Sequence, residues 1–181
     1  MTSRYDVDII QLTHPGDADP AVRREMTACW IAVTNAGGAA GFPFPPVSGE
    51  QVTPAVDALA AGLAPQRNRI LLARVDGALA GWVALSRDPS PLIAHWGTVH
   101  HLQTHLRHRR QGIGSALMCR LRQVARDEMG LEQLQLAVRG GMGLEDFYAR
   151  LGWEVTGRWP RKLRLALDDT RDEILMILTP L

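Results

Sequence analysis

The sequence predicts a single α/β domain over residues 1–181, with a mixed β-sheet flanked by helices. Two observations support this fold class. Short segments rich in β-branched residues alternate with segments whose apolar residues recur every three or four positions. Proline and glycine clusters separate these segments, and none is long enough to be an interdomain linker. The predicted order is β-α-α-β-β-β-α-β-α-β-β, and 181 residues suffice for a sizeable core.

The first strand is predicted over residues 6–12, where Val7, Ile9 and Ile10 are apolar. A helix follows from Asp19-Pro20 to about Asn35, because an acidic cap followed by proline typically starts a helix. Its apolar residues recur at spacings of three and four and predict one buried stripe: Val22, Met26, Cys29, Trp30 and Val33.

Residues 37–46 contain so many glycines and prolines that we expect a loop. A second helix is predicted over 50–63, with Pro54 marking its first turn. Strands at 69–75 and 78–86 are expected to form a hairpin, because Asp76-Gly77 is a strong turn signal.

The second half of the chain should contain a long strand before a helix, another strand, a short helix and two final strands. We expect Gly152 to lie at the C-terminus of the short helix. The predicted ranges are 93–104, 113–129, 131–138, 143–151, 153–159 and 173–179.

The charges nearly balance, with 20 basic and 19 acidic residues, so no global field would attract nucleic acid or an anionic membrane. The N-terminus has no apolar signal core, and no apolar run approaches the roughly 20 residues of a membrane span. Cys29 and Cys119 are expected to be free thiols within helices. A soluble, cytoplasmic protein is the expectation.

The loop Arg109-Arg110-Gln111-Gly112-Ile113-Gly114-Ser115 joins a predicted strand to a predicted helix. Backbone N–H groups at a helix N-terminus form an anion site suited to phosphate. No lysine follows the glycines as in a P-loop, and Leu117 replaces the third glycine of a dinucleotide site. A tight turn without a ligand remains the alternative.

This Arg-x-x-Gly-x-Gly loop resembles the acyl-CoA-binding loop of the GCN5-related N-acetyltransferase (GNAT) superfamily, and the order of elements resembles the same fold. The resemblance implies that backbone N–H groups from about Arg110 to Ser115 bind the pyrophosphate of acetyl-CoA. It also implies that the preceding segment pairs with the pantetheine arm. The implied cofactor-binding residues are Leu102, Gln103, Thr104, Arg109, Arg110, Gln111, Gly112, Ile113, Gly114 and Ser115.

The segment Phe147-Tyr148-Ala149-Arg150-Leu151-Gly152-Trp153 resembles a second motif of that superfamily. There the matching tyrosine commonly acts as general acid, so the resemblance implies that Tyr148 protonates the CoA thiolate. A structural tyrosine in the core is the alternative. The glycine-rich stretch 140–143 and the short connection to Tyr148 loosely resemble the tabtoxin-resistance acetyltransferase.

Two hypotheses concern the group that accepts the amine proton. Several superfamily members have a glutamate where this chain has Thr98, which cannot act as a base. His100 should point to the same face of the strand and has a suitable pKa, whereas His101 should face the other side and pack against a helix. Deprotonation through water is the competing hypothesis.

The histidines between His95 and His108 do not have metal-ligand spacing, so we expect no metal site. The basic run 105–110 lacks interleaved aromatics and ends in the glycine loop, so we also expect no nucleic-acid binding.

The resemblance places the acceptor near residues 37–46 and 158–171. An apolar wall could include Phe42, Phe44, Trp96 and Trp159, with a cation held by Asp168, Asp169, Asp172 or Glu173, although these acids also fit a turn and a solvated strand start. The expected function is acetyl-CoA-dependent N-acetylation of a small-molecule primary amine in a ternary complex. Peptide or protein acetylation and a non-catalytic acyl-CoA-binding module remain alternatives, and the superfamily resemblance allows a homodimer.

Overall fold

The computed structural model describes residues 7–38 and 41–181, and its main helices and strands follow the predicted order. Asp6, the predicted start of the first strand, lies outside the described residues, as do two residues of the loop 37–46. The elements are β1 Asp8–Leu12, α1 Pro20–Asn35, α2 Gly49–Ala61, β2 Asn68–Val75, β3 Ala78–Arg87, β4 Trp96–Thr104, α3 Ile113–Gln123, β5 Gln133–Arg139, α4 Leu144–Ala149, β6 Glu154–Arg164 and β7 Thr170–Leu178. Short 3₁₀ turns cover Pro15–Asp17 and Leu106–His108.

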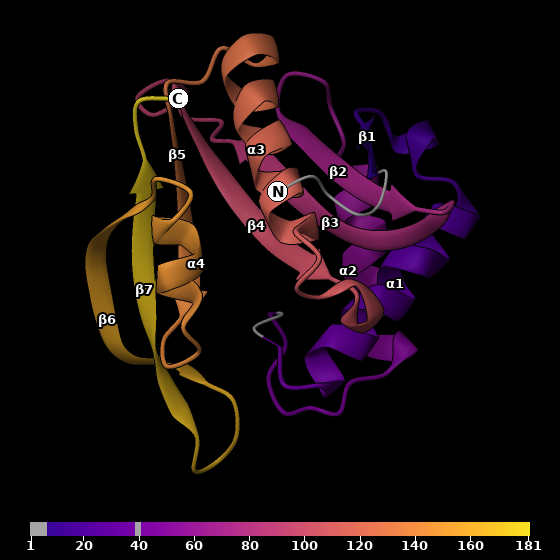
Figure 1. The fold of residues 1–181 in the computed structure, drawn as a ribbon, viewed down its shortest axis with the longest axis vertical. Helices are drawn as coiled ribbons and strands as arrows, with labels where there is room; N and C mark the ends of the chain where they lie inside the picture. The colour runs from indigo at the N-terminus through magenta and orange to yellow at the C-terminus, as the bar shows by residue number, and fades with distance from the viewer. Residues whose placement is uncertain (1–6, 39–40) are drawn as a thin grey trace.

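These strands form one seven-stranded sheet in the order β1-β2-β3-β4-β5-β7-β6 (Figure 1). All neighbours are antiparallel except β4 and β5, which are parallel. The β4–β5 pairing covers only Trp96–Thr98 opposite Gln133–Gln135. Beyond Thr98 the two strands diverge, and the mixed sheet predicted from the sequence has an opening near its centre.

Local sequence signals account for the first helix and the hairpin. The Asp19 carboxylate accepts a hydrogen bond from the Val22 amide at 2.8 Å, and the whole predicted apolar stripe of α1 is buried. Asp76 and Gly77 both have positive φ, at 51° and 79°, as a tight two-residue hairpin requires. Both predictions are confirmed.

The second helix starts within one residue of the predicted range 50–63, but the prediction that Pro54 marks its first turn was wrong. Helix α2 begins at Gly49, five residues before Pro54, which lies inside the helix. Ser48 caps it in a reciprocal capping box with Gln51, whose side-chain oxygen accepts from the Ser48 amide at 3.0 Å. This capping stabilises the first turn, so Pro54 only removes one internal hydrogen bond further along.

Three further boundaries differ from the prediction. β4 begins at Trp96 rather than at 93, because Trp96 N–H bonds the Ile93 carbonyl in a turn. Helix α3 ends at Gln123 and continues as one π-helical turn over Val124–Glu128. Strands β6 and β7 form a longer hairpin than predicted, because their pairing continues to Arg164 and Thr170.

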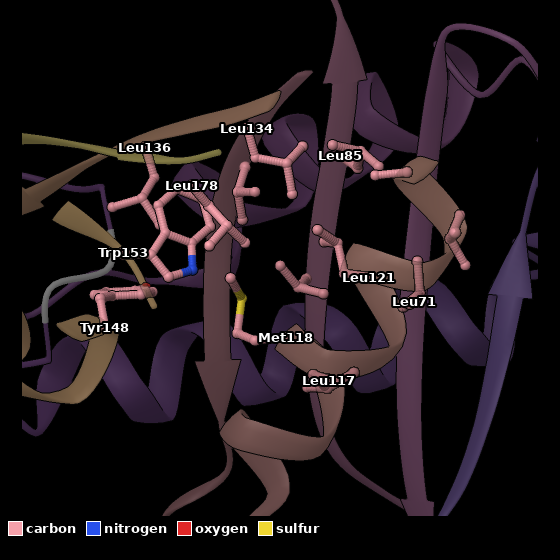
Figure 2. Close-up of a cluster of buried hydrophobic side chains, with 14 of the residues drawn as sticks. Leu71, Leu85, Leu117, Met118, Leu121, Leu134, Leu136, Tyr148, Trp153 and Leu178 are labelled. Carbon is pink, nitrogen blue, oxygen red and sulfur yellow. The ribbon is translucent and has the colours of Figure 1, made fainter. Parts of the chain in front are cut away.

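Alternation along the strands divides the buried apolar side chains between two faces of the sheet. One core lies beneath α1 and α2 and includes Trp30 and Trp82. The other lies beneath α3 and α4 and extends from Leu71 to Tyr148 and Trp153 (Figure 2). Helices therefore cover both faces of the central strands.

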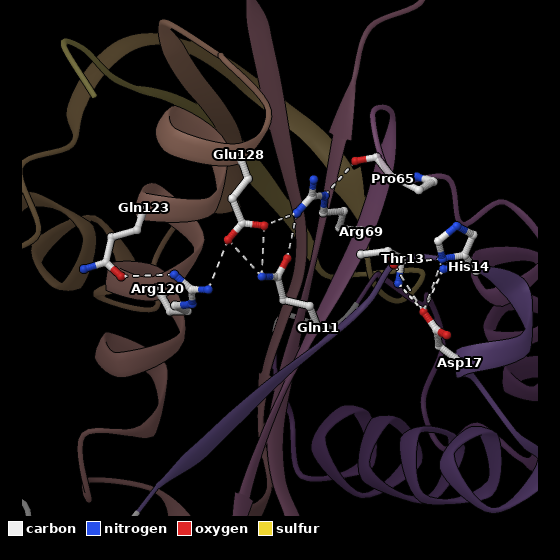
Figure 3. A network of polar contacts seen from close by, with 9 residues as sticks. All are labelled: Gln11, Thr13, His14, Asp17, Pro65, Arg69, Arg120, Gln123 and Glu128. Atoms are coloured by element: carbon white, nitrogen blue, oxygen red, sulfur yellow. Dashed lines mark hydrogen bonds and ion pairs between the residues drawn. The ribbon is translucent and has the colours of Figure 1, made fainter.

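A polar network around the buried Arg69 joins β1 and β2 to the π-helical turn (Figure 3). The Arg69 guanidinium is buried and lies 2.5 Å from the Glu128 carboxylate. Arg69 also donates to the Gln11 side chain and to the Pro65 carbonyl. Arg120 donates to the other Glu128 oxygen at 3.1 Å. Glu128 therefore neutralises the buried cation.

Replacing Glu128 with alanine is expected to lower the free energy of unfolding by about 3 kcal/mol, because Arg69 would keep a buried charge without its carboxylate. Burial alone would raise the pKa of Glu128, but the bonds from Arg69 and Gln11 leave it below its usual value. The stabilisation is therefore present above the usual pKa and lost as pH falls through the lowered one. Urea denaturation at several pH values measures both effects.

Asp127→Ala is the matched control, because Asp127 pairs only with exposed Arg126 on the surface. Its free energy of unfolding should stay within about 0.5 kcal/mol of the wild-type value. Equal losses in the two variants would contradict the role given to Glu128.

Candidate active site

The divergence of β4 and β5 opens a cleft of about 1040 Å³ through the centre of the sheet. On the α3 side, the start of α3 and residues of α4 line it. On the α1 side, the loop after α1 and residues of β4, β5 and β6 line it. Two ligands that enter from opposite faces of the sheet could therefore meet inside it.

A β-bulge in β4 shapes the wall of this cleft. His101 has a positive φ of 56°, and the pairing of β3 with β4 shifts register between Trp82 and Ala84. The bulge places His100 and His101 on the same face, with ring centroids 5.9 Å apart. The prediction that His101 faces the other side was wrong, because strict alternation fails at a bulge. His101 does pack against a helix, with its ring 4.7 Å from Trp30 of α1.

The glycine loop brings backbone N–H groups to the cleft. Gly112 is the N-cap of α3 with φ 84°, and no side chain caps this helix. The first amides of α3, from Ile113 to Ser115, consequently have no partner within the helix. Of the predicted cofactor-binding residues, eight line the cleft: Leu102, Thr104, Arg109, Arg110, Gly112, Ile113, Gly114 and Ser115.

The other two predicted residues do not line the cleft. Gln103 is buried, and the nitrogen and oxygen of its side-chain amide have no hydrogen-bond partner within the described residues. The Gln111 side chain instead donates to the Arg107 carbonyl at 3.0 Å, within the loop itself. A binding role for either residue would rest on its backbone, and it stays a prediction.

Tyr148 lies on α4 and lines the cleft, while its ring packs against Phe147 and Trp153. Burial raises the pKa of Tyr148 to about 12, so the phenol keeps its proton at neutral pH. Within residues 7–38 and 41–181, no group forms a hydrogen bond with this hydroxyl. Tyr148 is thus a core residue that also presents a protonated side chain to the cleft.

His100 lies across the opening, on β4. Its Nε2 atom is 2.8 Å from the Ser86 hydroxyl, within hydrogen-bond distance. Burial lowers the pKa of His100, which favours the neutral imidazole. His100 and His101 also line a second cavity of about 270 Å³ beside β3, so both spaces reach these two residues. Thr98 lines the main cleft, but its hydroxyl accepts a hydrogen bond from Gln135.

Only some of the candidate acceptor residues reach the cleft. Phe42 and Glu173 line it, whereas the aromatic residues Phe44, Trp96 and Trp159 do not. Asp172 pairs with Arg158 and Asp169 with Arg171, away from the cleft lining. Arg139, at the end of β5, also lines the cleft but was not predicted, because nothing in the sequence separates it from an ordinary surface arginine.

In the described part of the chain, no group of three or more histidine, cysteine, aspartate or glutamate side chains could hold a metal ion. The described helices include none that is long and apolar enough to cross a membrane.

The family model described as "Acetyltransferase (GNAT) family" matches residues 26–153, well over half of the chain. The chain belongs to this family. It is therefore an N-acetyltransferase, and acetyl-CoA is its acetyl donor. The start of α3 and the tyrosine of α4 both lie within the matched range.

Solved structures of the same fold agree with this assignment. An acetyltransferase of the GNAT family from Streptococcus pneumoniae superposes with a TM-score of 0.72 at 20% identity, over 96% of this chain and 99% of that chain. The yncA protein from Salmonella typhimurium, solved with its cofactor acetyl-CoA, gives 0.72 at 17% identity over 96% and 94%. The ribosomal-protein-S18-alanine N-acetyltransferase from Escherichia coli gives 0.69 at 18% identity over 97% and 94%. No curated protein matches the chain.

The residues at the start of α3 suit the phosphates of acetyl-CoA. The unpartnered amides of the first turn lie beside Arg109 and Arg110, which supply positive charge at the helix N-terminus. A Cβ atom at Gly112 would meet nothing within 4 Å, so there is open space beside the loop. These residues could therefore hold the phosphates at this end of the cleft.

Proposed function

We propose that the protein acetylates the primary amine of a small molecule by direct attack within a ternary complex. The observation that supports this most is the opening between β4 and β5, which both groups of residues line. The start of α3 and Tyr148 lie on one side of it, and His100 lies on the other. An amine held near His100 would face the acetyl group without any covalent enzyme intermediate.

The residues have complementary roles in this proposal. The amides at the start of α3, with Arg109 and Arg110, hold the phosphates and thereby orient the donor. Acetyl-CoA supplies an activated thioester when bound. Tyr148 donates its phenolic proton to the sulfur as that atom leaves. His100, neutral because it is buried, accepts the proton that the amine releases, with Ser86 fixing the ring.

A small acceptor is favoured over a protein chain by the loop after α1, which lines part of the cleft. The Phe44 amide donates to the Leu165 carbonyl at 2.8 Å, so this loop is tied to the β6–β7 connection. A loop held in this position leaves less room for an extended peptide than for a small molecule. Because one neighbour of similar fold is named as a ribosomal-protein alanine N-acetyltransferase, peptides belong in the substrate panel.

Thiol release from acetyl-CoA should rise when a suitable primary amine is added, and the acetylated amine should be detectable by mass spectrometry. The panel should contain small amines, amino acids and peptides with free N-termini. Calorimetry measures acetyl-CoA binding separately. Binding without amine-dependent thiol release from any member would support the non-catalytic alternative and contradict the proposal.

His100→Gln is expected to lower kcat/KM about tenfold at neutral pH, because glutamine cannot accept the amine proton. The pKa of His100 lies below its usual value of 6.5, and the neutral form is the active one. The ratio of wild-type to variant activity should therefore be constant above pH 6.5 and should decrease as pH falls through the lowered pKa of His100. Taking the ratio cancels the titration of the amine.

His14→Gln, an exposed histidine outside the cleft, is the control and should match the wild type. A ratio near one for His100→Gln at every pH would favour deprotonation through water.

A further inference from the structure

Arg139 ends β5 on the face of the sheet that α1 covers. Its neighbours Leu136 and Val138 are buried with Tyr148 in the core under α3 and α4. Alternation therefore turns Arg139 to the opposite face, where it lines the cleft. One guanidinium nitrogen lies 3.4 Å from the Gly38 carbonyl, in the loop after α1. Arg139 is thus on the acceptor side, across the sheet from the start of α3.

The guanidinium of Arg139 lacks an anionic partner. Across residues 7–38 and 41–181, no carboxylate forms an ion pair with it, and its Nε atom is buried without a hydrogen bond. Burial lowers the pKa of Arg139, and the negative charge of Asp169, which acts in the opposite direction, does not offset this effect. Both nearby carboxylates already have cations: Asp169 pairs with Arg171, and Glu173 with Lys162. A half-buried cation with one long hydrogen bond is costly unless an anion completes it.

Two other arginines, Arg87 and Arg122, also have a buried Nε atom without a partner. Each donates to a backbone carbonyl, of Met129 or Pro180, and neither lines the cleft. An unpartnered Nε alone therefore does not mark a binding site. What sets Arg139 apart is its position in the cleft on the acceptor side.

We infer that the acceptor carries a carboxylate beside its amine, as an amino acid does, and that Arg139 binds this carboxylate. The inference rests on the proposed function and names the class of its substrate. A planar guanidinium fork matches a carboxylate. Glu173, the cross-strand neighbour of Arg139, disfavours a doubly charged phosphate there. The apolar side chains of Phe42, Leu163 and Leu165 suit an apolar amino-acid side chain.

The test compares three forms of one acceptor: the acid L-phenylalanine, its amide L-phenylalaninamide, and phenethylamine, which lacks the carboxyl group. The same three forms are compared for L-leucine and L-methionine. The amide has the more weakly basic amine, so a preference for the acid cannot come from the fraction of neutral amine. Arg139→Gln should raise the KM of the acid at least about tenfold, with kcat and the KM for acetyl-CoA unchanged. KM for phenethylamine should not change, and Arg139→Lys should recover part of the loss.

Arg122→Gln is the matched control, because Arg122 shares the buried Nε and the single carbonyl partner but lies outside the cleft. It should leave every KM unchanged. Equal or better KM values for the amide and phenethylamine in the wild type would overturn the inference while the acetyltransferase function stands. So would an Arg139→Gln variant that leaves the KM of the acid unchanged.

Calorimetry separates this inference from the proposed function. L-Phenylalanine is titrated into protein saturated with CoA, and the measurement is repeated with Arg139→Gln and Arg139→Lys. Binding that depends on Arg139, without turnover of any amine, would support the inference and overturn the function. If no acid binds and no acid is turned over, the inference is overturned.

Discussion

Tyr148→Phe is expected to lower kcat about 10²- to 10³-fold, because the variant cannot donate a proton to the leaving sulfur. Phenylalanine keeps the ring that packs between Phe147 and Trp153, so the fold should persist. The KM for acetyl-CoA should stay close to that of the wild type. Steady-state kinetics with a saturating amine measure both constants, and thermal unfolding checks the fold.

The pH dependence of the Tyr148 effect follows from the burial of its hydroxyl. Burial raises the pKa of Tyr148 to about 12, so the donor form is fully present below that value and lost only as pH rises through it. The wild-type to variant ratio of kcat should therefore stay constant between about pH 7 and pH 10. A variant with wild-type kcat would show that Tyr148 is only a core residue, the alternative left open by the sequence.

Local signals were enough to predict most of the fold. The Asp19 cap and the apolar stripe of α1 act within one helix, and the Asp76-Gly77 turn joins two adjacent strands. The glycine loop could be identified because its chemistry lies in consecutive backbone groups. One local signal was misinterpreted: Pro54 does not mark the first turn of α2, because Ser48 and Gln51 stabilise a first turn that begins at Gly49.

Features that depend on distant parts of the chain were not predictable. The bulge at His101 arises from pairing with β3, and it reverses the face that simple alternation assigns. β7 lies between β5 and β6, an order that no local pattern reveals. Arg139 is distinctive because the fold places it in the cleft, where the nearby carboxylates pair with other cations. The donor half of the site was therefore easier to predict than the acceptor half.

Gly114→Ala is expected to raise the Kd for acetyl-CoA about thirtyfold, a loss near 2 kcal/mol. A Cβ atom there would lie 3.4 Å from the Phe147 ring and 3.6 Å from the Thr104 hydroxyl. Both are ordinary contacts, so the protein itself accommodates the methyl group. The methyl would narrow the cleft where α3 presents its amides, and the donor could no longer approach the backbone as closely. Calorimetry with acetyl-CoA measures the change.

Stability should move in the opposite direction from affinity. Alanine favours helical backbone over glycine by up to about 1 kcal/mol, and Gly114 lies in the first turn of α3. The free energy of unfolding should therefore stay level or rise while acetyl-CoA binding weakens. Gly16→Ala is the control, because its Cβ would meet nothing within 4 Å and it lies outside the cleft. Unchanged affinity in Gly114→Ala would mean that the donor does not contact this turn of α3, whereas a joint loss of affinity and stability would mean that the methyl distorts the helix.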